Sequence, residues 1–264
     1  MLVVIRGGGD IASGVALRLY RCGVTPVLCE IPFPTAIRRT VCFSEAVRLG
    51  ETAVEGVPAR RAEAEEVPGL ISRGIIPVLV DPEAACVRAL KPDVVVDAIL
   101  AKRNLGTIRD MAPIVVAVGP GFTAGVDCHA VVETMRGHTL GRAIYQGGAL
   151  PNTAVPGLIG GYAGERVLRA PADGVFRAAR QIGDQVRAGD TAGYVEGLPI
   201  VCTIDGVLRG LLADGTEVVK GLKSGDVDPR CRPEFCRMVS DKALAVGGGV
   251  LEAILHLSGA LDQV

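Results

Sequence analysis

The chain has 264 residues, of which 49% are hydrophobic and 22% charged. This composition can bury a core and is typical of a globular protein of one large or two ordinary domains. With 28 Lys and Arg against 29 Asp and Glu, the chain lacks the basic excess of a nonspecific nucleic-acid binder. No apolar run is long enough for a membrane helix, and the first residues have no signal-peptide pattern. We therefore expect a cytoplasmic protein that binds neither nucleic acid nor membranes.

Strand and helix patterns alternate through the first part of the chain. Unbroken apolar runs predict strands over residues 2–6, 25–30, 75–80, 94–99 and 114–118. Helical patterns lie between several of them, from a glycine-rich turn to residue 22, over residues 62–73, and over residues 81–90. This alternation predicts a Rossmann-like α/β domain with a mostly parallel sheet over residues 1–148.

The glycine-rich turn joins the first predicted strand to the first predicted helix. It matches the pattern G-x-G-x-x-G/A and consists of Gly7, Gly8, Gly9, Asp10, Ile11 and Ala12. In dinucleotide-binding folds this turn approaches a pyrophosphate, and an acidic residue ending the second strand, here Glu30, binds a ribose hydroxyl. The turn therefore predicts nucleotide binding. The alternative is a scaffold that binds nothing here, because the acidic side chain of Asp10 can repel a phosphate.

Three further loops carry polar groups where the carboxyl ends of the strands are expected, which is where open α/β sheets bind ligands. The candidate cofactor-binding residues in these loops are Arg38, Arg39, Lys102, Asn104, Gly119, Gly121, Phe122 and Thr123. Taken one by one, basic pairs are common on solvated surfaces and Gly-Pro-Gly is common in plain turns. Their expected convergence on one crevice favours a polyanionic ligand.

The candidates for catalysis are Cys128, His129, Cys231 and Cys236. Arginines flank the last two cysteines, and a cation lowers the pKa of a nearby thiol. Each candidate also has a structural interpretation, as an ordinary thiol or a hydrogen-bonded core histidine. The eight cysteines contain no C-x-x-C pair and the chain has only three histidines. We therefore predict free thiols and no metal site.

The second part of the chain contains an internal repeat. It follows a predicted linker, residues 149–165, that is rich in Gly and Pro. Both copies of the repeat share an Asp-Gly-Val triplet and a later valine, at 173–175 and 186 in the first copy and at 205–207 and 218 in the second. Two strand-and-turn copies predict a small β-barrel, a barrel-sandwich with a two-fold repeat, over residues 166–230.

This repeat resembles the biotinyl/lipoyl-type barrels. In those modules a carrier lysine lies in the hairpin that joins the halves, whereas residues 195–200 of this chain contain no lysine. We therefore expect no covalent biotin or lipoyl group, and a docking or spacing role instead. Residues 231–264 are expected to form a tail and a C-terminal helix. Its glycines at 247–249 predict close packing on another backbone or, alternatively, an anion site at the start of the helix.

Seven blocks, in order along nearly the whole chain, carry a second resemblance: residues 4–12, 34–40, 96–102, 119–125, 133–138, 169–174 and 247–252. They resemble the YqeB-type accessory proteins of the selenium-dependent molybdenum hydroxylase system. The resemblance implies a role in the maturation of xanthine-dehydrogenase-like molybdenum hydroxylases. The implied partners are the hydroxylase apoenzyme and its maturation machinery, and homo-oligomers are compatible with it. It brings no agreed catalytic residues.

Residues and resemblance together predict an accessory factor that binds a nucleotide-bearing cofactor, such as the cytosine-dinucleotide form of the molybdenum cofactor. If the factor carries sulfur or selenium, Cys128, Cys231 and Cys236 are the candidate carriers. Two alternatives remain open at this stage. One is an NAD(P)-dependent oxidoreductase that uses the same glycine turn, in which Glu30 would favour NAD over NADP. The other is a non-catalytic scaffold with a vestigial nucleotide fold.

Overall fold

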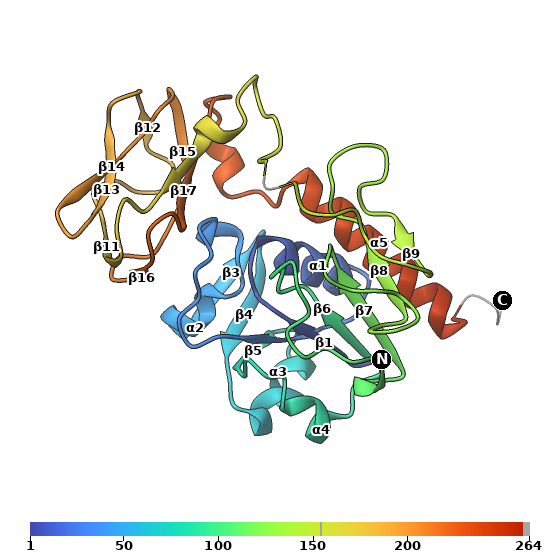
Figure 1. The fold of residues 1–264 in the computed structure, drawn as a ribbon. Coiled ribbons are helices and arrows are strands. Elements are labelled where there is room, and N and C mark those ends of the chain that lie inside the picture. Colours follow the sequence, from blue (N-terminus) through green and yellow to red (C-terminus); the bar gives the residue numbers. More distant parts are fainter. Residues whose placement is uncertain (154, 261–264) are drawn as a thin grey trace. The chain divides into compact units, whose positions relative to one another are not determined.

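The computed structural model describes residues 1–153 and 155–260, which form two compact units (Figure 1). Within these described residues, the first unit comprises 1–34, 42–153 and 239–260, and the second comprises 35–41 and 155–238. The units therefore divide the chain differently from the predicted domains. Residues 35–41 belong to the second unit, and the predicted tail is divided after Met238. None of the helices in the described residues has the length and apolar character needed to cross a bilayer.

A nine-stranded sheet forms the centre of the first unit, in the order β3-β4-β5-β2-β1-β6-β7-β8-β9. The strands are β1 (Val3–Arg6), β2 (Val27–Glu30), β3 (Glu51–Val54), β4 (Val57–Arg61), β5 (Ile76–Val80), β6 (Val94–Asp97), β7 (Ile114–Val118), β8 (Ala130–Val132) and β9 (Ala143–Ile144). All neighbours from β4 to β8 pair in parallel, and only the edge strands β3 and β9 are antiparallel. The prediction of an α/β fold with a mostly parallel sheet is confirmed.

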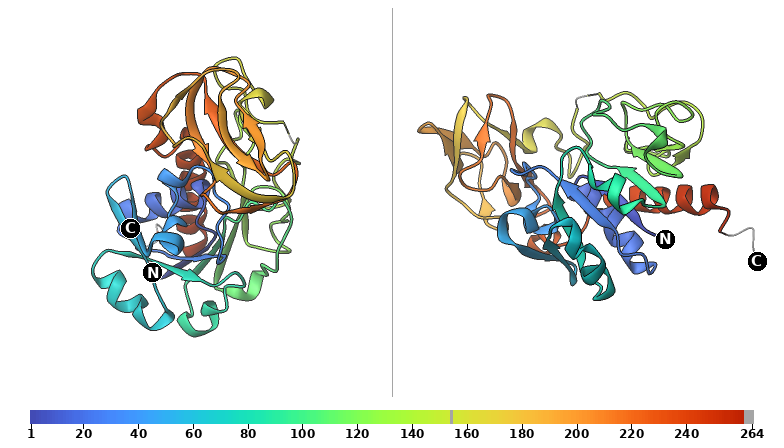
Figure 2. Two further views of the ribbon diagram at one scale, coloured as in Figure 1. Left: turned by 90° about the vertical axis from the view of Figure 1, so that its left-hand side faces the viewer. Right: turned by 90° about the horizontal axis from the view of Figure 1, so that it is seen from below.

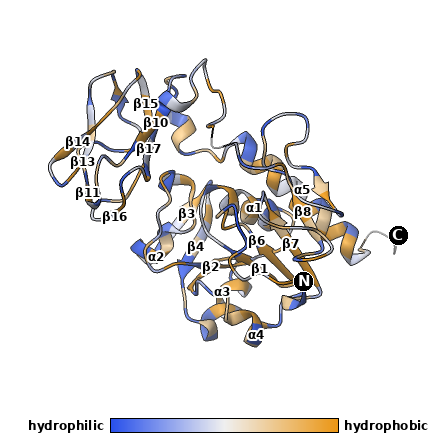
Figure 3. Cartoon of the chain, viewed as in Figure 1, coloured by the Kyte–Doolittle hydropathy of each residue, from blue (hydrophilic) through white to orange (hydrophobic). Residues whose placement is uncertain are grey.

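The strand order places a switch point at the centre of this sheet. When the β3–β4 hairpin and β9 are set aside, the remaining six strands, numbered along the chain, follow the order 3-2-1-4-5-6 of dinucleotide-binding folds. The order reverses between β1 and β6, which is where such folds bind their ligands. The central strands are buried on both faces, as their unbroken apolar runs predicted, and Figure 3 shows them among the most hydrophobic parts of the chain.

Among the described residues, the helices that accompany the sheet are α1 (Asp10–Arg21), α2 (Glu45–Leu49), α3 (Val67–Ser72), α4 (Cys86–Leu90) and α5 (Asp241–Ser258). Side chains of α3 and α4 share a buried cluster with one face of the strands. Helix α5, from the end of the chain, packs against α1 and against β7 and β8, as Figures 1 and 2 show. It thereby covers strands whose own connections contain no α-helix.

Glycines allow α1 and α5 to approach closely. A Cβ added to Gly14 of α1 would lie 2.6 Å from the Cβ of Ala243, and one added to Gly247 would lie 2.9 Å from the carbonyl oxygen of Gly14. A Cβ on Gly249 would collide with the carbonyl oxygen of Gly141. The predicted close packing on another backbone is confirmed for Gly247 and Gly249.

Local sequence patterns missed or displaced several elements of the first unit. Neither α2 nor the β3–β4 hairpin was predicted, because these segments are short and partly exposed. The helix expected over residues 81–90 begins only at Cys86. The cause is the carboxylate of Asp81, which accepts the amides of Ala85 (2.9 Å) and Cys86 (2.8 Å) and so ends an extended turn before the helix.

The second unit consists of two four-stranded antiparallel sheets, in the orders β10-β17-β15-β12 and β14-β13-β11-β16. Their strands are β10 (Val167–Arg169), β11 (Gly174–Ala178), β12 (Gln185–Val186), β13 (Thr191–Val195), β14 (Leu198–Val201), β15 (Gly206–Leu211), β16 (Glu217–Val218) and β17 (Lys223–Asp228). Residues from both sheets, among them Phe176 and Leu208, form one buried cluster. The cluster supplies this unit with a core of its own.

The internal repeat is visible in the strand pairing of this unit. Gly174 of the first copy pairs with Val218 of the second, and Gly206 of the second copy pairs with Val186 of the first. Equivalent positions of the two copies therefore exchange partners, as a two-fold relation requires. The structure confirms two antiparallel sheets built on this repeat.

Candidate functional site

The glycine turn lies at the carboxyl end of β1, where the structure places the amino end of α1. Gly7 has a φ of +102°, which L side chains rarely adopt, and a Cβ there would lie 3.0 Å from the carbonyl oxygen of Ala98. The amide of Gly8 donates to the carboxylate of Glu30 (2.8 Å), and its carbonyl accepts from the Ser13 hydroxyl (3.1 Å) and the Ser44 amide (2.9 Å). The peptide groups of Gly8 are therefore engaged by the protein itself.

Gly9 differs from its two neighbours in the turn. A Cβ added to it would meet nothing within 4 Å, and its φ of −69° is open to any residue. Helix α1 begins directly after it, so the partial positive charge of the helix start lies beside this open position. An anion approaching the turn would therefore meet it at Gly9, and the other two glycines serve the packing of the turn.

Glu30 supports the turn in this structure. One carboxylate oxygen accepts from Gly8 and the other accepts the amide of Ile31 (2.8 Å). Burial raises the pKa of Glu30, while the hydrogen bonds from Ile31 and Gly8 act in the opposite direction. Glu30 was expected to bind a ribose hydroxyl. It instead binds the backbone of the glycine turn, which was expected to bind the pyrophosphate.

A buried polar cluster occupies the switch point, between the carboxyl ends of β1 and β6. Arg6 and Asp97 are paired residues of these strands, with Nη1 of Arg6 3.5 Å from Oδ2 of Asp97. The Thr107 hydroxyl lies between them, 2.5 Å from each of these two atoms. The other guanidinium nitrogen, Nη2, donates to the carbonyls of Pro82 (3.2 Å) and Leu105 (3.0 Å). No local motif indicated this cluster, although each charged residue ends an apolar strand.

Two of the predicted loops, residues 102–106 and 119–129, meet in the structure. A Cβ added to Gly121 would lie 2.7 Å from the Cα of Arg103, so Gly121 permits the contact. Gly119 also has a positive φ, of +81°, and Phe122 is buried beside the sheet. The prediction that these loops converge therefore holds for this pair.

The polar side chains of these two loops mostly bind neighbouring backbone. Asn104 donates to the carbonyl of Thr107 and accepts its amide, both at 2.8 Å. The amide of Thr123 donates to Asp127 (2.7 Å). Lys102 is exposed, which leaves it as the accessible cation of the predicted set in the first unit.

Arg38 and Arg39 belong to the second unit and bind backbone there. Arg38 is buried and donates to the carbonyls of Phe235 (3.1 Å) and Met238 (2.9 Å), and Arg39 donates to the carbonyl of Leu211 (2.9 Å). Their predicted role beside the glycine turn rested on the expectation that they belong to the first domain. The structure instead gives them packing roles within the second unit.

Two of the four catalytic candidates, Cys128 and Cys236, are buried thiols, and a third, His129, is hydrogen-bonded to the backbone. Burial is the main cause that raises the pKa of the Cys128 thiol, to about 12, and burial also raises the pKa of Cys236. Nδ1 of His129 accepts the amide of Val115 (2.9 Å), and burial followed by the charge of Arg109 lowers the pKa of the imidazole. Cys231 is the exposed thiol of the set.

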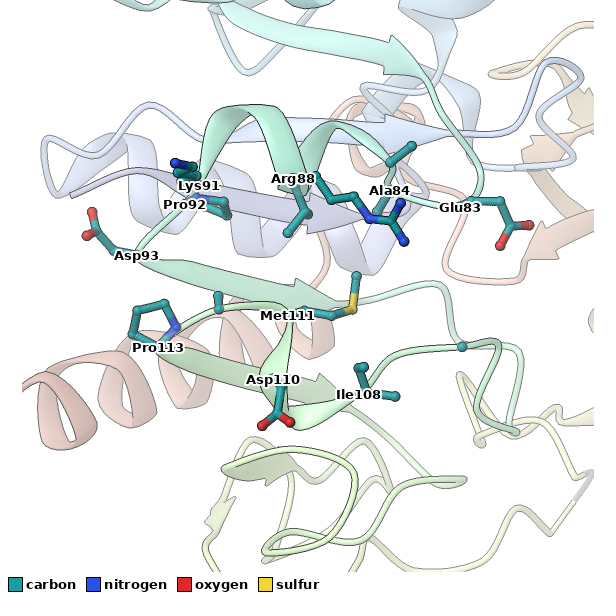
Figure 4. Close-up of a pocket in the computed structure, with 14 residues that line it drawn as sticks. Glu83, Ala84, Arg88, Lys91, Pro92, Asp93, Ile108, Asp110, Met111 and Pro113 are labelled. Carbon is teal, nitrogen blue, oxygen red and sulfur yellow. The ribbon is translucent and has the colours of Figure 1, made fainter.

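A pocket of about 970 Å³ opens beside α4 and the 3-10 turn η3 (Arg109–Met111), as Figure 4 shows. Apolar side chains of Val87, Ile108 and Met111 line it together with charged ones, including those of Arg88 and Asp110. It lies where the connection between β6 and β7 supplies only η3 in place of a helix. No local pattern in the sequence indicated this pocket.

The comparisons with known proteins find a relative by sequence but give no information about the candidate site. No protein-family model matches the chain. Protein YqeB of Escherichia coli (strain K12), described as uncharacterized, is 55% identical over 257 residues, which are 97% of this chain and 48% of that protein. The predicted resemblance to YqeB-type proteins is confirmed. The chain spans about half the length of this curated relative.

Two solved structures show only remote similarity. A succinylglutamate desuccinylase/aspartoacylase from Rhodobacter sphaeroides is 14% identical, with a TM-score of 0.26 and coverage of 86% of this chain and 84% of that one. An aspartoacylase family protein from Mesorhizobium loti is 12% identical, with a TM-score of 0.28 and coverage of 88% and 86%. Such low TM-scores support no conclusion about the fold or the activity.

Proposed function

We propose that this chain is an accessory factor in the maturation of selenium-dependent molybdenum hydroxylases, and that its first unit binds a nucleotide-bearing cofactor. The cytosine-dinucleotide form of the molybdenum cofactor fits this role. Its proposed partners are the hydroxylase apoenzyme and the maturation machinery, in the cytoplasm. The similarity to YqeB over nearly the whole chain supports the family part of the proposal.

One observation carries the binding part of the proposal. Gly9 leaves open space at the amino end of α1, directly after β1, in a sheet with the strand order of dinucleotide-binding folds. A phosphate there would meet the helix start without any rearrangement of the engaged Gly8. Lys102, exposed on a loop that follows β6, supplies a cation on the same edge of the sheet.

The second unit is proposed to be a biotinyl/lipoyl-like barrel that serves in docking. Its β13–β14 hairpin turns at Glu196 and Gly197, both with positive φ, where the carrier modules have their lysine. The Glu196 carboxylate accepts the amide of Val175 (3.1 Å), so this turn is tied to the first copy of the repeat. A rigid turn without a carrier group is suited to protein contact rather than to group transfer.

A scaffold without a small-molecule ligand is the second candidate, and the contact of Glu30 with Gly8 favours it. This carboxylate occupies an amide that a pyrophosphate would use in a dinucleotide-binding turn. An NAD(P)-dependent oxidoreductase shares the same requirement for the turn and gains no separate support from the site.

The test is direct identification of a ligand. The protein is purified from a host that makes molybdenum cofactor, and any small molecule released on denaturation is identified by mass spectrometry. The stripped protein is then titrated with CTP, pterin dinucleotide, NAD and NADP. Binding of a pterin or cytidine nucleotide supports the proposal, binding of NAD alone supports the oxidoreductase, and no binding supports the scaffold.

A matched pair of variants locates the ligand. Gly9→Val projects a side chain into the open space at the start of α1, and Gly69→Val in α3 does the same at a position that also has no neighbour within 4 Å. We expect only the Gly9 variant to lose binding while both remain folded. Retained affinity in Gly9→Val would refute the glycine-turn site.

A further inference from the structure

Two buried thiols and a carboxylate meet at the carboxyl edge of the first sheet. Cys29 lies in β2, Cys86 is the first residue of α4, and Asp81 directly follows β5. The two sulfurs are 3.4 Å apart, and one ligand atom from each of the three residues lies within 4.8 Å of the other two. We propose that these side chains form a binding site for a thiophilic divalent cation, with Zn²⁺ as the best fit.

The backbone already holds the carboxylate of this cluster in place. The amide of Asp81 donates to the carbonyl of Glu30 (3.0 Å), which continues the pairing of β2 with β5. Its two carboxylate oxygens accept the amides of Ala85 and Cys86, so the carboxylate and the start of α4 are oriented together. Outer hydrogen bonds of this kind orient metal ligands, and each oxygen keeps a lone pair for a cation.

The ligand set selects the type of cation. Thiolates favour zinc and other soft or borderline ions, whereas Mg²⁺ and Ca²⁺ require oxygen ligands. Two thiolates and one carboxylate supply three ligands, and a tetrahedral ion keeps its fourth position for water or another molecule. Cys29 is only 3% exposed and Cys86 only 9%, so the fourth position lies towards Asp81, which is the more accessible of the three.

The surroundings of Cys29 include groups that oppose a thiolate and one that favours it. The hydrogen bond from Cys86 and then burial raise the pKa of the Cys29 thiol, so a cation must displace the proton of this thiol before its sulfur can bind. Binding of a divalent cation by two thiolates releases the thiol protons to solvent and leaves two thiolates and one carboxylate around the cation. Arg6, the strand partner of Cys29 on β1, carries a positive charge that favours the thiolate.

The site does not depend on the proposed nucleotide function, and its test uses a separate readout. The full-length protein is reduced, stripped with a chelator and titrated with Co²⁺, whose bonds to thiolates give a charge-transfer absorption band. Zn²⁺ is then added to displace Co²⁺, and bound metal is counted by mass spectrometry. We expect one cation per chain, loss of the cobalt band on adding zinc, and a higher Tm with zinc than without it.

Variants assign the binding to these residues. Cys29→Ala and Cys86→Ala are expected to abolish the cobalt band, and Asp81→Asn to weaken zinc binding by at least the 10–100-fold that is typical for loss of an outer partner of a metal ligand. Cys202→Ala, which removes a buried thiol from the second unit, is the control and should bind as the parent does. Asp81→Asn keeps both thiols, so it decides the question if a cysteine variant fails to fold.

Three results would overturn the proposal. The first is the absence of stoichiometric Co²⁺ or Zn²⁺ binding by the reduced protein. The second is unchanged affinity in Cys29→Ala, Cys86→Ala and Asp81→Asn. The third is a Cys29–Cys86 disulfide in the purified protein with no cation binding after its reduction, which would identify the pair as a redox couple instead.

Discussion

The three glycines in the middle of α5 allow a sharp test of how closely α5 packs on α1 and on the segment around Gly141. Each is changed to alanine in turn, which adds one methyl group at three consecutive helical positions. Alanine favours a helix over glycine by about 0.5–1 kcal/mol at an exposed interior position. At Gly248 the added Cβ would meet nothing within 4 Å, so this variant should gain the full amount.

The same gain is opposed at the two flanking positions. A Cβ on Gly247 would lie 2.9 Å from the carbonyl oxygen of Gly14 and 3.1 Å from the Cβ of Arg18. One on Gly249 would collide with the carbonyl oxygen of Gly141 and lie 2.8 Å from a methyl group of Val132. Overpacking of this kind costs about 1–3 kcal/mol. From the most to the least stable protein, the expected order is Gly248→Ala, the parent, Gly247→Ala and Gly249→Ala.

The free energy of unfolding is measured by urea denaturation, with thermal unfolding as a second probe. For a unit of this size, a difference of 1 kcal/mol shifts Tm by about 2–4 °C. The denaturant dependence should be equal in all four proteins, because the variants change the native contacts and not the surface exposed on unfolding. Equal stability of Gly249→Ala and Gly248→Ala would refute the assignment of close backbone packing to this helix.

Three further predictions concern titration and thiol reactivity. Although burial alone would raise the pKa of Asp228, its hydrogen bonds with Arg230 and the nearby charges hold it below the usual value, so its stabilisation should be present above about pH 4 and be lost as the pH falls further. Urea titrations of the parent and Asp228→Asn at several acidic pH values test this, and an equal acid sensitivity of the two would contradict it. Because the pKa of His129 is lowered in the folded state, its stabilisation should be present above about pH 6.5 and decline below that, and His129→Gln should remove this decline. In native protein a thiol reagent should modify exposed Cys231 well before Cys128, as peptide mass spectrometry after short labelling can show; early labelling of Cys128 would contradict its burial.

The fold of the first unit was largely predictable from local sequence patterns. Buried parallel strands need unbroken apolar runs, and these runs mark β1, β2, β5, β6 and β7 within one or two residues at most ends. The β3–β4 hairpin was missed because an edge hairpin needs only one apolar face and follows no long-range pattern. The position of α5 on the first unit was missed because no local signal shows which surface a terminal helix will cover.

The candidate site was less predictable than the fold. The pattern of the glycine turn located the end of β1 correctly, but the partners of Gly8 come from Glu30 and Ser44, and only the folded chain brings them together. Arg38 and Arg39 were expected beside this turn because they follow a predicted strand. They belong to the second unit, since a short segment of the chain crosses to it before the first unit resumes.

Parallel pairing explains why charged and thiol side chains that the sequence did not single out lie along one edge of the sheet. Cys29, Arg6 and Asp97 are register partners on the adjacent strands β2, β1 and β6, so their side chains point to the same face at the carboxyl ends. Asp81 follows β5, the next strand in the same row. Residues that are far apart in sequence thus become neighbours because each ends a strand. In a sheet of this kind, polar residues that end apolar runs therefore indicate which side chains will meet at the carboxyl edge, even where no motif connects them.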